Sequence, residues 1–267
     1  GEDSNQSLIY KFSGFYPMPC VYDKFDGWNI DPYLDVGDPF YFDMAYYNLF
    51  VEVPIGFVVA ATGKLVEKKV NGLNALYHFD TIYPVREVTF SASKYFMIDS
   101  KIVNGVNIST YYLPKSQSIW KNYALDYGIN AFTLYNEIFG IYPYPTFNIV
   151  EEYSFFGGME YPNQVYITES IDYWKYPQWF LEKFIVHETS HQWWYNLVGN
   201  DEVDWGFLDE MLACWSTDYY AEIYHSDWKY FQHELYIDKV RTYYAEEELP
   251  NRINQSIYEC YTTYTDY

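Results

Sequence analysis

Residues 187–194 read HETSHQWW, and this stretch carries the most specific structural and chemical signal in the chain. Its first five residues match the pattern HExxH. Residues i and i+4 of a helix project from the same face, so the imidazoles of His187 and His191 reach one cation. Glu188 lies one step round the helix, placed to take a proton from a metal-bound water. The pattern alone also fits an ordinary polar stripe on an amphipathic helix.

A third donor must come from elsewhere, because catalytic zinc usually takes three protein ligands and leaves its fourth position to water. Glu210 follows His191 after 18 intervening residues, within a second helical pattern at 207–224. The short connection predicts two adjacent antiparallel helices that converge on one ion. We therefore expect Glu210 to complete the metal site. Four neighbouring carboxylates could also supply this donor, but most of them are expected to be solvated loop charges: Asp201, Glu202, Asp204 and Asp209.

The chain before this site reads as antiparallel sheet. Between residues 41 and 112, apolar residues alternate with polar ones or form short β-branched and aromatic runs, which is typical of strands. Glycine and Asn-Gly pairs between the runs predict tight hairpin turns. The predicted strands lie at about 45–53, 57–61, 85–90, 95–99 and 106–112.

The pattern changes near Pro114. Apolar residues then recur at spacings of three and four and predict a long helix over 119–138, which Gly140 and Pro143 end. We expect an α+β fold: a partial N-terminal β domain at 1–113, and a mainly helical domain with a small sheet at 114–267. Further elements are predicted after the long helix, as strands at 147–152 and 164–168 and as helices at 177–196, 207–224 and 227–244.

The composition excludes some classes of partner. The chain has 267 residues, of which 49% are hydrophobic, so it has enough apolar material for a large core. Its 16 basic and 37 acidic residues give a net charge of −21, which argues against binding to nucleic acid or anionic membranes, because both are polyanions. No apolar run approaches the roughly 20 residues that span a bilayer. Three distant cysteines predict neither a thiolate metal site nor an extensive disulfide framework: Cys20, Cys214 and Cys260.

Three sequence elements together resemble the aminopeptidase-N-like (alanyl aminopeptidase) zinc metallopeptidases of the gluzincin type. The signature of that family is HExxH, then 18 residues, then Glu, with a GxMEN loop upstream. This chain has HExxH at 187–191, the spaced Glu210, and GGMEY at 157–161. The resemblance covers residues 111–244, and the strand-rich first part is similar to the end of that family's β domain.

The resemblance implies a thermolysin-like catalytic domain with one catalytic zinc ion. His187, His191 and Glu210 would bind the metal. Glu188 would act as the general base on a zinc-acidified water and carry the proton to the leaving amine.

The loop upstream of the motif is implied to bind substrate. The family's loop glutamate, which is Glu160 here, grips the free α-ammonium of the substrate, while Gly157 and Gly158 let the backbone approach closely next to Met159. The expected partner is therefore a peptide with a free N-terminus, and the expected activity is that of an aminopeptidase.

Two positions depart from the family pattern. Tyr161 stands where the family commonly has asparagine, which changes how the loop is braced. The family also uses a downstream tyrosine as an oxyanion donor. By family spacing it falls just past Tyr267, although several tyrosines lie near the end: Tyr258, Tyr261, Tyr264 and Tyr267. We expect a fragment that covers the end of the β domain and most of the catalytic domain.

Two alternatives stay open beside the aminopeptidase. One is a zinc endopeptidase that uses the same catalytic helix without the amine anchor. The other is a non-catalytic peptide-binding fragment or scaffold, against which the intact Glu188 argues, because a binding module needs no base.

Overall fold

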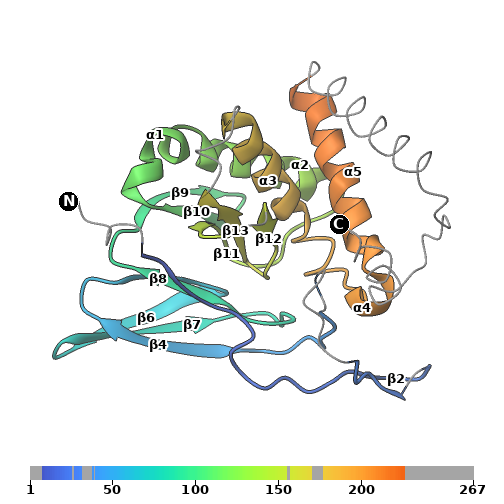
Figure 1. The fold of residues 1–267 in the computed structure, drawn as a ribbon, viewed down its shortest axis with the longest axis horizontal. Helices are drawn as coiled ribbons and strands as arrows, with labels where there is room; N and C mark the ends of the chain where they lie inside the picture. Colours follow the sequence, from blue (N-terminus) through green and yellow to red (C-terminus); the bar gives the residue numbers. More distant parts are fainter. Residues whose placement is uncertain are drawn as a thin grey trace, which may run out of the picture. The chain divides into compact units, whose positions relative to one another are not determined.

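The structure is a computed structural model that describes residues 8–25, 27–31, 38, 40–154, 157–169 and 177–225. Within these ranges the chain contains both strands and helices (Figure 1), which confirms the predicted α+β class. The chain forms two compact units. The first unit comprises Gly1–Pro19 and Phe42–Val198, and the second comprises Cys20–Tyr41 and Gly199–Tyr267. The predicted division at residues 113 and 114 stays a prediction.

The N-terminal part of the first unit contains two antiparallel three-stranded sheets. One has the order β4 (Asn48–Pro54), β7 (Asn74–Asp80) and β6 (Lys64–Asn71). The other has the order β1 (Tyr10–Phe12), β8 (Phe90–Ser93) and β5 (Val58–Ala61). Alternate residues of these strands meet in one buried cluster, as the period of two predicted: Val51, Val59, Ala61, Ala75, Tyr77, Phe79 and Ala92.

A five-stranded mixed sheet positions the predicted site. Its strands are β9 (Met97–Val103), β10 (Val106–Tyr112), β11 (Thr146–Glu152), β12 (Gly158–Met159) and β13 (Gln164–Thr168). Their order is β12-β13-β11-β10-β9, with β10, β11 and β13 mutually parallel and β12 antiparallel at one edge. The short β12 is therefore an edge strand of this sheet.

Helices α2 (Leu125–Ile138) and α3 (Pro177–Ser190) pack on each other and on this sheet. The contact is close at Gly128, where a β-carbon would collide with the Ile149 side chain of β11. The predicted helix over 119–138 is instead composite. It consists of α1 (Gln117–Ile119), a π-helical segment η3 (Trp120–Ala124) and α2. A 3-10 turn at Pro114–Ser116 precedes it.

Several predicted strands are shifted by a few residues, as at 95–99, where β9 covers Met97–Val103, and two predicted elements differ more clearly. The helix expected over 177–196 ends at Ser190, and a compact turn over 191–198 follows, in which Tyr195 has a positive φ of 116°. The strand expected at 85–90 is absent from this described stretch, and β8 begins only at Phe90, because Val85 forms an isolated bridge to Ala45 and Arg86 bonds to the turn.

In its described residues the second unit contains a short hairpin and two helices: β2 (Tyr22–Asp23), β3 (Gly27–Trp28), α4 (Glu202–Trp205) and α5 (Phe207–Tyr224). Asp201 caps α4 by accepting hydrogen bonds from the amides of Val203 and Asp204. Asn29 donates to the other oxygen of the Asp201 carboxylate, which ties the hairpin segment to the start of α4.

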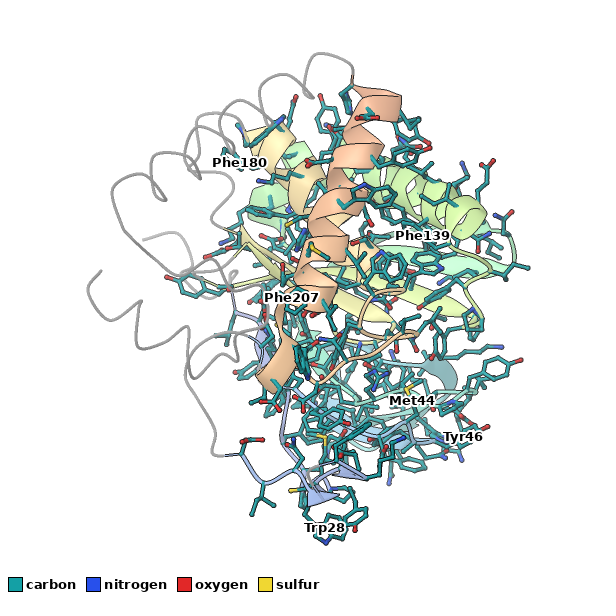
Figure 2. The ribbon with its side chains drawn as sticks, turned by 90° about the vertical axis from the view of Figure 1, so that its right-hand side faces the viewer. Trp28, Met44, Tyr46, Phe139, Phe180 and Phe207 are labelled. Carbon is teal, nitrogen blue, oxygen red and sulfur yellow. The ribbon has the colours of Figure 1, made fainter. Side chains whose placement is uncertain are left out.

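The side chain of Trp28 on β3 is exposed, as Figure 2 shows. The observed α5 has the predicted bounds, whereas the helix predicted at 227–244 lies outside the described residues. No helix among the described residues combines the length and apolar character that crossing a bilayer requires.

Candidate metal centre

The HExxH residues bring two ring nitrogens to one point. The Nε2 atoms of His187 and His191 are 3.3 Å apart, although His191 lies one residue beyond the end of α3. A tetrahedral zinc ion bound at about 2.05 Å by each nitrogen requires a separation of about 3.3 Å. The two imidazoles therefore fit a shared zinc ion, and a single shared proton is the other cation that this spacing admits.

The orientation of the His191 ring is fixed by the backbone that follows it. Its Nδ1 atom lies 3.0 Å from the carbonyl oxygen of Trp194. Because a carbonyl oxygen only accepts, Nδ1 carries the proton and Nε2 of the neutral ring keeps its lone pair. His191 is fully buried, so this hydrogen bond is sheltered from water. A metal-ligating histidine commonly has such a partner on its second nitrogen.

Glu188 lies against the GGMEY loop. Its side chain is buried on α3, and a β-carbon built on Gly158 would collide with the Glu188 carboxylate. A β-carbon on Gly157 would collide with the ring of Phe184, one turn earlier on the same helix. Both glycines are therefore required by close packing of the loop on α3.

The loop also brings Glu160 to the histidines. Gly158 and Met159 form β12 and pair with Ile167 and Tyr166 of β13. Glu160 follows directly and is buried, with a carboxylate oxygen within 4.8 Å of a ring nitrogen of His191. The first unit thus brings together all the predicted site residues except Glu210.

Gln192 joins the metal motif to this loop. The side chain is fully buried, its Nε2 donates to the carbonyl of Tyr161, and its Oε1 accepts from the amide of Asn163 at 2.8 Å. Tyr161, the departure from the family pattern, is buried, and its ring lies at a steep angle to that of Tyr166. The segment after Glu160 is therefore braced by a side chain adjacent to His191.

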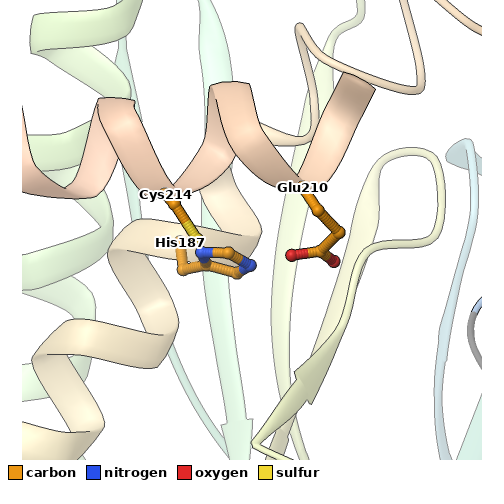
Figure 3. A group of neighbouring side chains, drawn as sticks. All are labelled: His187, Glu210 and Cys214. Atoms are coloured by element: carbon orange, nitrogen blue, oxygen red, sulfur yellow. The ribbon is translucent and has the colours of Figure 1, made fainter. Parts of the chain in front are cut away.

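Glu210 belongs to the second unit. It is half-buried in the first turn of α5, and Glu210 and Cys214 project from the same side of that helix, while Figure 3 also draws His187 on α3. An oxygen of Glu210 lies within 4.8 Å of the Cys214 sulfur. The convergence of Glu210 with the two histidines stays a prediction.

Most of the four carboxylates beside Glu210 were expected to be solvated, but none of them is fully exposed. Glu202 and Asp209 are buried, and Asn200 donates a hydrogen bond to Asp209 at 3.0 Å. Burial raises the pKa of Asp209, while hydrogen bonds from Asn200 and Glu202 lower it. Asp201 is half-buried as the cap of α4. The prediction failed because loop sequences do not reveal which carboxylates the fold covers.

Sequence reasoning missed the residues that hold the motif in place. Gln192, Trp194 and Tyr195 lie in a stretch whose apolar pattern predicted helix, so no turn was expected there. The four C-terminal tyrosines considered as oxyanion donors lie outside the described residues.

Chemically, the first unit brings together two imidazole nitrogens, of which that of His191 keeps its lone pair, and two buried carboxylates, Glu188 and Glu160. Neutral imidazole nitrogen is a common zinc ligand, and a carboxylate beside a metal can accept a proton. The donor set therefore fits a divalent cation with an adjacent base.

Comparison with known proteins also indicates a peptidase. The peptidase family M1 domain matches residues 123–265. Aminopeptidase M1-A of Oryza sativa subsp. japonica is 23% identical over 194 residues, which make up 69% of this chain. The matched region is 22% of the length of that relative.

Proposed function

The chain belongs to peptidase family M1, and we propose that it contains the zinc site of a metallopeptidase that removes N-terminal residues from peptides. The observation that carries this proposal is the 3.3 Å separation of the Nε2 atoms of His187 and His191. Glu188 beside Gly158, and Glu160 near His191, add a base and an anchoring carboxylate.

In this proposal His187, His191 and Glu210 hold one zinc ion. Bound zinc supplies Lewis acidity that polarises the scissile carbonyl and acidifies water. The chain's own contribution is the orientation of the donors: the Trp194 carbonyl holds the Nδ1 proton of His191, so that Nε2 presents its lone pair.

Glu188 acts as the general base. Its carboxylate takes a proton from the attacking water and delivers it to the leaving amine. The buried position against Gly158 limits the rotamers of this side chain, so the base is held ready.

Glu160 selects the end of the peptide. A buried carboxylate attracts the α-ammonium of a free N-terminus, whereas an internal peptide bond offers no such cation. Since Gly157, Gly158 and Met159 form or flank an edge strand, they offer backbone groups to an extended substrate.

The finer fold is part of the same proposal. A thermolysin-like catalytic domain is supported by α2 and α3 on the mixed sheet with its edge strand β12. The chain spans 22% of the rice relative, so the activity of a whole protein of that kind comes to this chain only as a proposal.

The experiment compares zinc content with hydrolysis of matched peptides. The purified protein should bind one zinc ion per chain and release the first residue from a peptide with a free amino terminus. It should leave the N-acetylated peptide intact. Internal cleavage of both peptides would replace the aminopeptidase with an endopeptidase. Peptide binding without any hydrolysis would support the scaffold instead.

A further inference from the structure

The turn over 191–198 contains a backbone conformation that needs support. Tyr195 has a φ of 116°, a region that favours glycine, so holding another residue there costs free energy. Its side chain is buried nonetheless. Such a residue persists only where its surroundings determine its position from several sides.

Two neighbouring residues from far away in the sequence supply that support. Arg86 donates through Nε to the carbonyl of Tyr195 at 2.6 Å and through a terminal nitrogen to the carbonyl of Phe42 at 2.9 Å. The Tyr195 hydroxyl donates to Oε1 of Glu87 at 2.5 Å. Residues of the segment before β8 thus hydrogen-bond to both the backbone and the side chain of Tyr195.

The segment that grips Tyr195 is itself anchored. Val85 exchanges backbone hydrogen bonds with Ala45, and the Tyr47 hydroxyl donates to the carbonyl of Arg86. Glu87 is 1% exposed, so the hydrogen bond from Tyr195 does not compete with water. The support is therefore a fixed part of the first unit.

Aromatic rings also pack against the turn. Phe139, labelled in Figure 2, has its ring centroid 4.7 Å from that of Trp194. The indole of Trp193 donates to the carbonyl of Gly140 at 2.9 Å. Both residues of the Trp194–Tyr195 peptide are therefore held in place, Trp194 by ring packing and Tyr195 by hydrogen bonds.

This peptide carries the oxygen that orients His191. The carbonyl of Trp194 accepts the Nδ1 proton of His191, and the next residue is the one that Arg86 and Glu87 hold. We propose that Arg86, Glu87 and Tyr195 form a positioning clamp that fixes the tautomer and ring orientation of His191. The expected effect of this clamp on zinc affinity rests on the proposed function.

Four variants distinguish an effect of the clamp from a general effect of removing a buried hydrogen bond. Tyr195→Phe removes only the hydroxyl that reaches Glu87. Glu87→Leu removes the acceptor, while Glu87→Gln retains an oxygen at a similar place. Tyr77→Phe is the matched control, because Tyr77 is also buried in the first unit and its hydroxyl donates to the carbonyl of Phe57 at 2.7 Å.

The first measurement is zinc affinity by competition with a chromophoric chelator at constant pH. Loss of an outer partner of a metal ligand typically weakens binding by about 10- to 100-fold. We expect a loss in that range for Tyr195→Phe and Glu87→Leu, and affinity near that of the unsubstituted chain for Glu87→Gln and Tyr77→Phe. Circular dichroism and thermal unfolding of Tyr195→Phe should match those of Tyr77→Phe.

The second measurement needs no metal. Nitrogen-15 chemical shifts of the metal-free protein report the tautomer of His191, which should be the Nδ1–H form and should become mixed in Tyr195→Phe. Equal zinc affinity and an unchanged tautomer in Tyr195→Phe and Glu87→Leu would overturn the clamp. A chain that binds no zinc but shows the expected tautomer change would instead overturn the proposed function and leave the clamp standing.

Discussion

Glu188 is the residue on which turnover depends most directly in the proposed mechanism. Replacing it by Gln keeps the shape of the side chain but removes the base, so we expect hydrolysis to fall by at least about 100-fold. Zinc content should stay at the level of the unsubstituted chain, because Glu188 is not a proposed ligand. Steady-state peptide hydrolysis and metal analysis of the same preparation check both statements. Glu67→Gln, at an exposed position of β6, is the control.

Gly158 leaves no space for a side chain beside the base. The added methyl group of Gly158→Ala would collide with the Glu188 carboxylate, and overpacking of this kind typically costs about 1–3 kcal/mol. We expect lower kcat together with a lower free energy of unfolding, measured by urea denaturation. Undiminished kcat in this variant would show that Glu188 moves aside freely, contrary to a base held in position.

Glu87 makes stability depend on pH. Burial raises the pKa of its carboxyl from 4.5 to about 7, while the Tyr195 hydroxyl and Lys11 lower it. A carboxyl whose pKa is higher in the folded than in the unfolded chain binds its proton more tightly when folded. Its stabilising contribution is therefore complete below pH 4.5 and is lost as the pH rises through 7.

The corresponding change in the free energy of unfolding is at most about 3 kcal/mol, because one unit of pKa shift corresponds to 1.36 kcal/mol. Urea unfolding between pH 5 and pH 8, at roughly unit steps, measures the free energy of unfolding over this window. Glu87→Gln carries no titratable proton and should flatten the dependence, whereas Glu67→Gln should leave it unchanged. A curve for Glu87→Gln that parallels that of the unsubstituted chain would contradict the assignment.

At the scale of elements, Gln192 links the end of α3 to the segment that follows β12. Gln192→Leu fits the buried space but leaves the Asn163 amide without this partner, at about 1–3 kcal/mol, while the Tyr161 carbonyl keeps the hydrogen bond that the Gln164 amide donates. We expect a lower unfolding midpoint and a higher KM, because Glu160 lies on the segment that becomes loose. Gln117→Leu, at a half-buried glutamine that begins α1, should change neither quantity.

Comparison of predicted with observed elements shows where local sequence patterns are enough to predict the bounds of a helix or strand. The strand at 106–112, the strand at 164–168 and the helix at 207–224 have the predicted bounds. The helix predicted through 196 ends at Ser190. Its apolar tail, Trp193 and Trp194, is buried or half-buried by the turn and not by a helical face. Apolar residues indicate burial, and the backbone that achieves burial depends on the neighbours.

At the scale of the whole molecule, zinc should stabilise the folded chain. A ligand that binds only the folded state adds about 2.7 kcal/mol at 100 times its dissociation constant. Removing zinc with a chelator should therefore lower the thermal midpoint, and re-addition should restore it. Glu210→Gln should reduce this zinc-dependent shift, while Glu222→Gln, at an exposed position of the same helix, should retain it. A full shift in Glu210→Gln would remove Glu210 from the ligand set.

The α+β class, the family and the pair of histidines can all be inferred from the amino-acid sequence. The pair depends on a spacing of four residues, because a single turn of backbone brings the two rings together. The residues that hold this pair in place become visible only once the chain is folded. Glu87 and Tyr195 are 108 residues apart, and Asn163 and Gln192 are 29 apart. No local period encodes such contacts, because they arise when separate elements pack into one core and their buried polar groups must find partners.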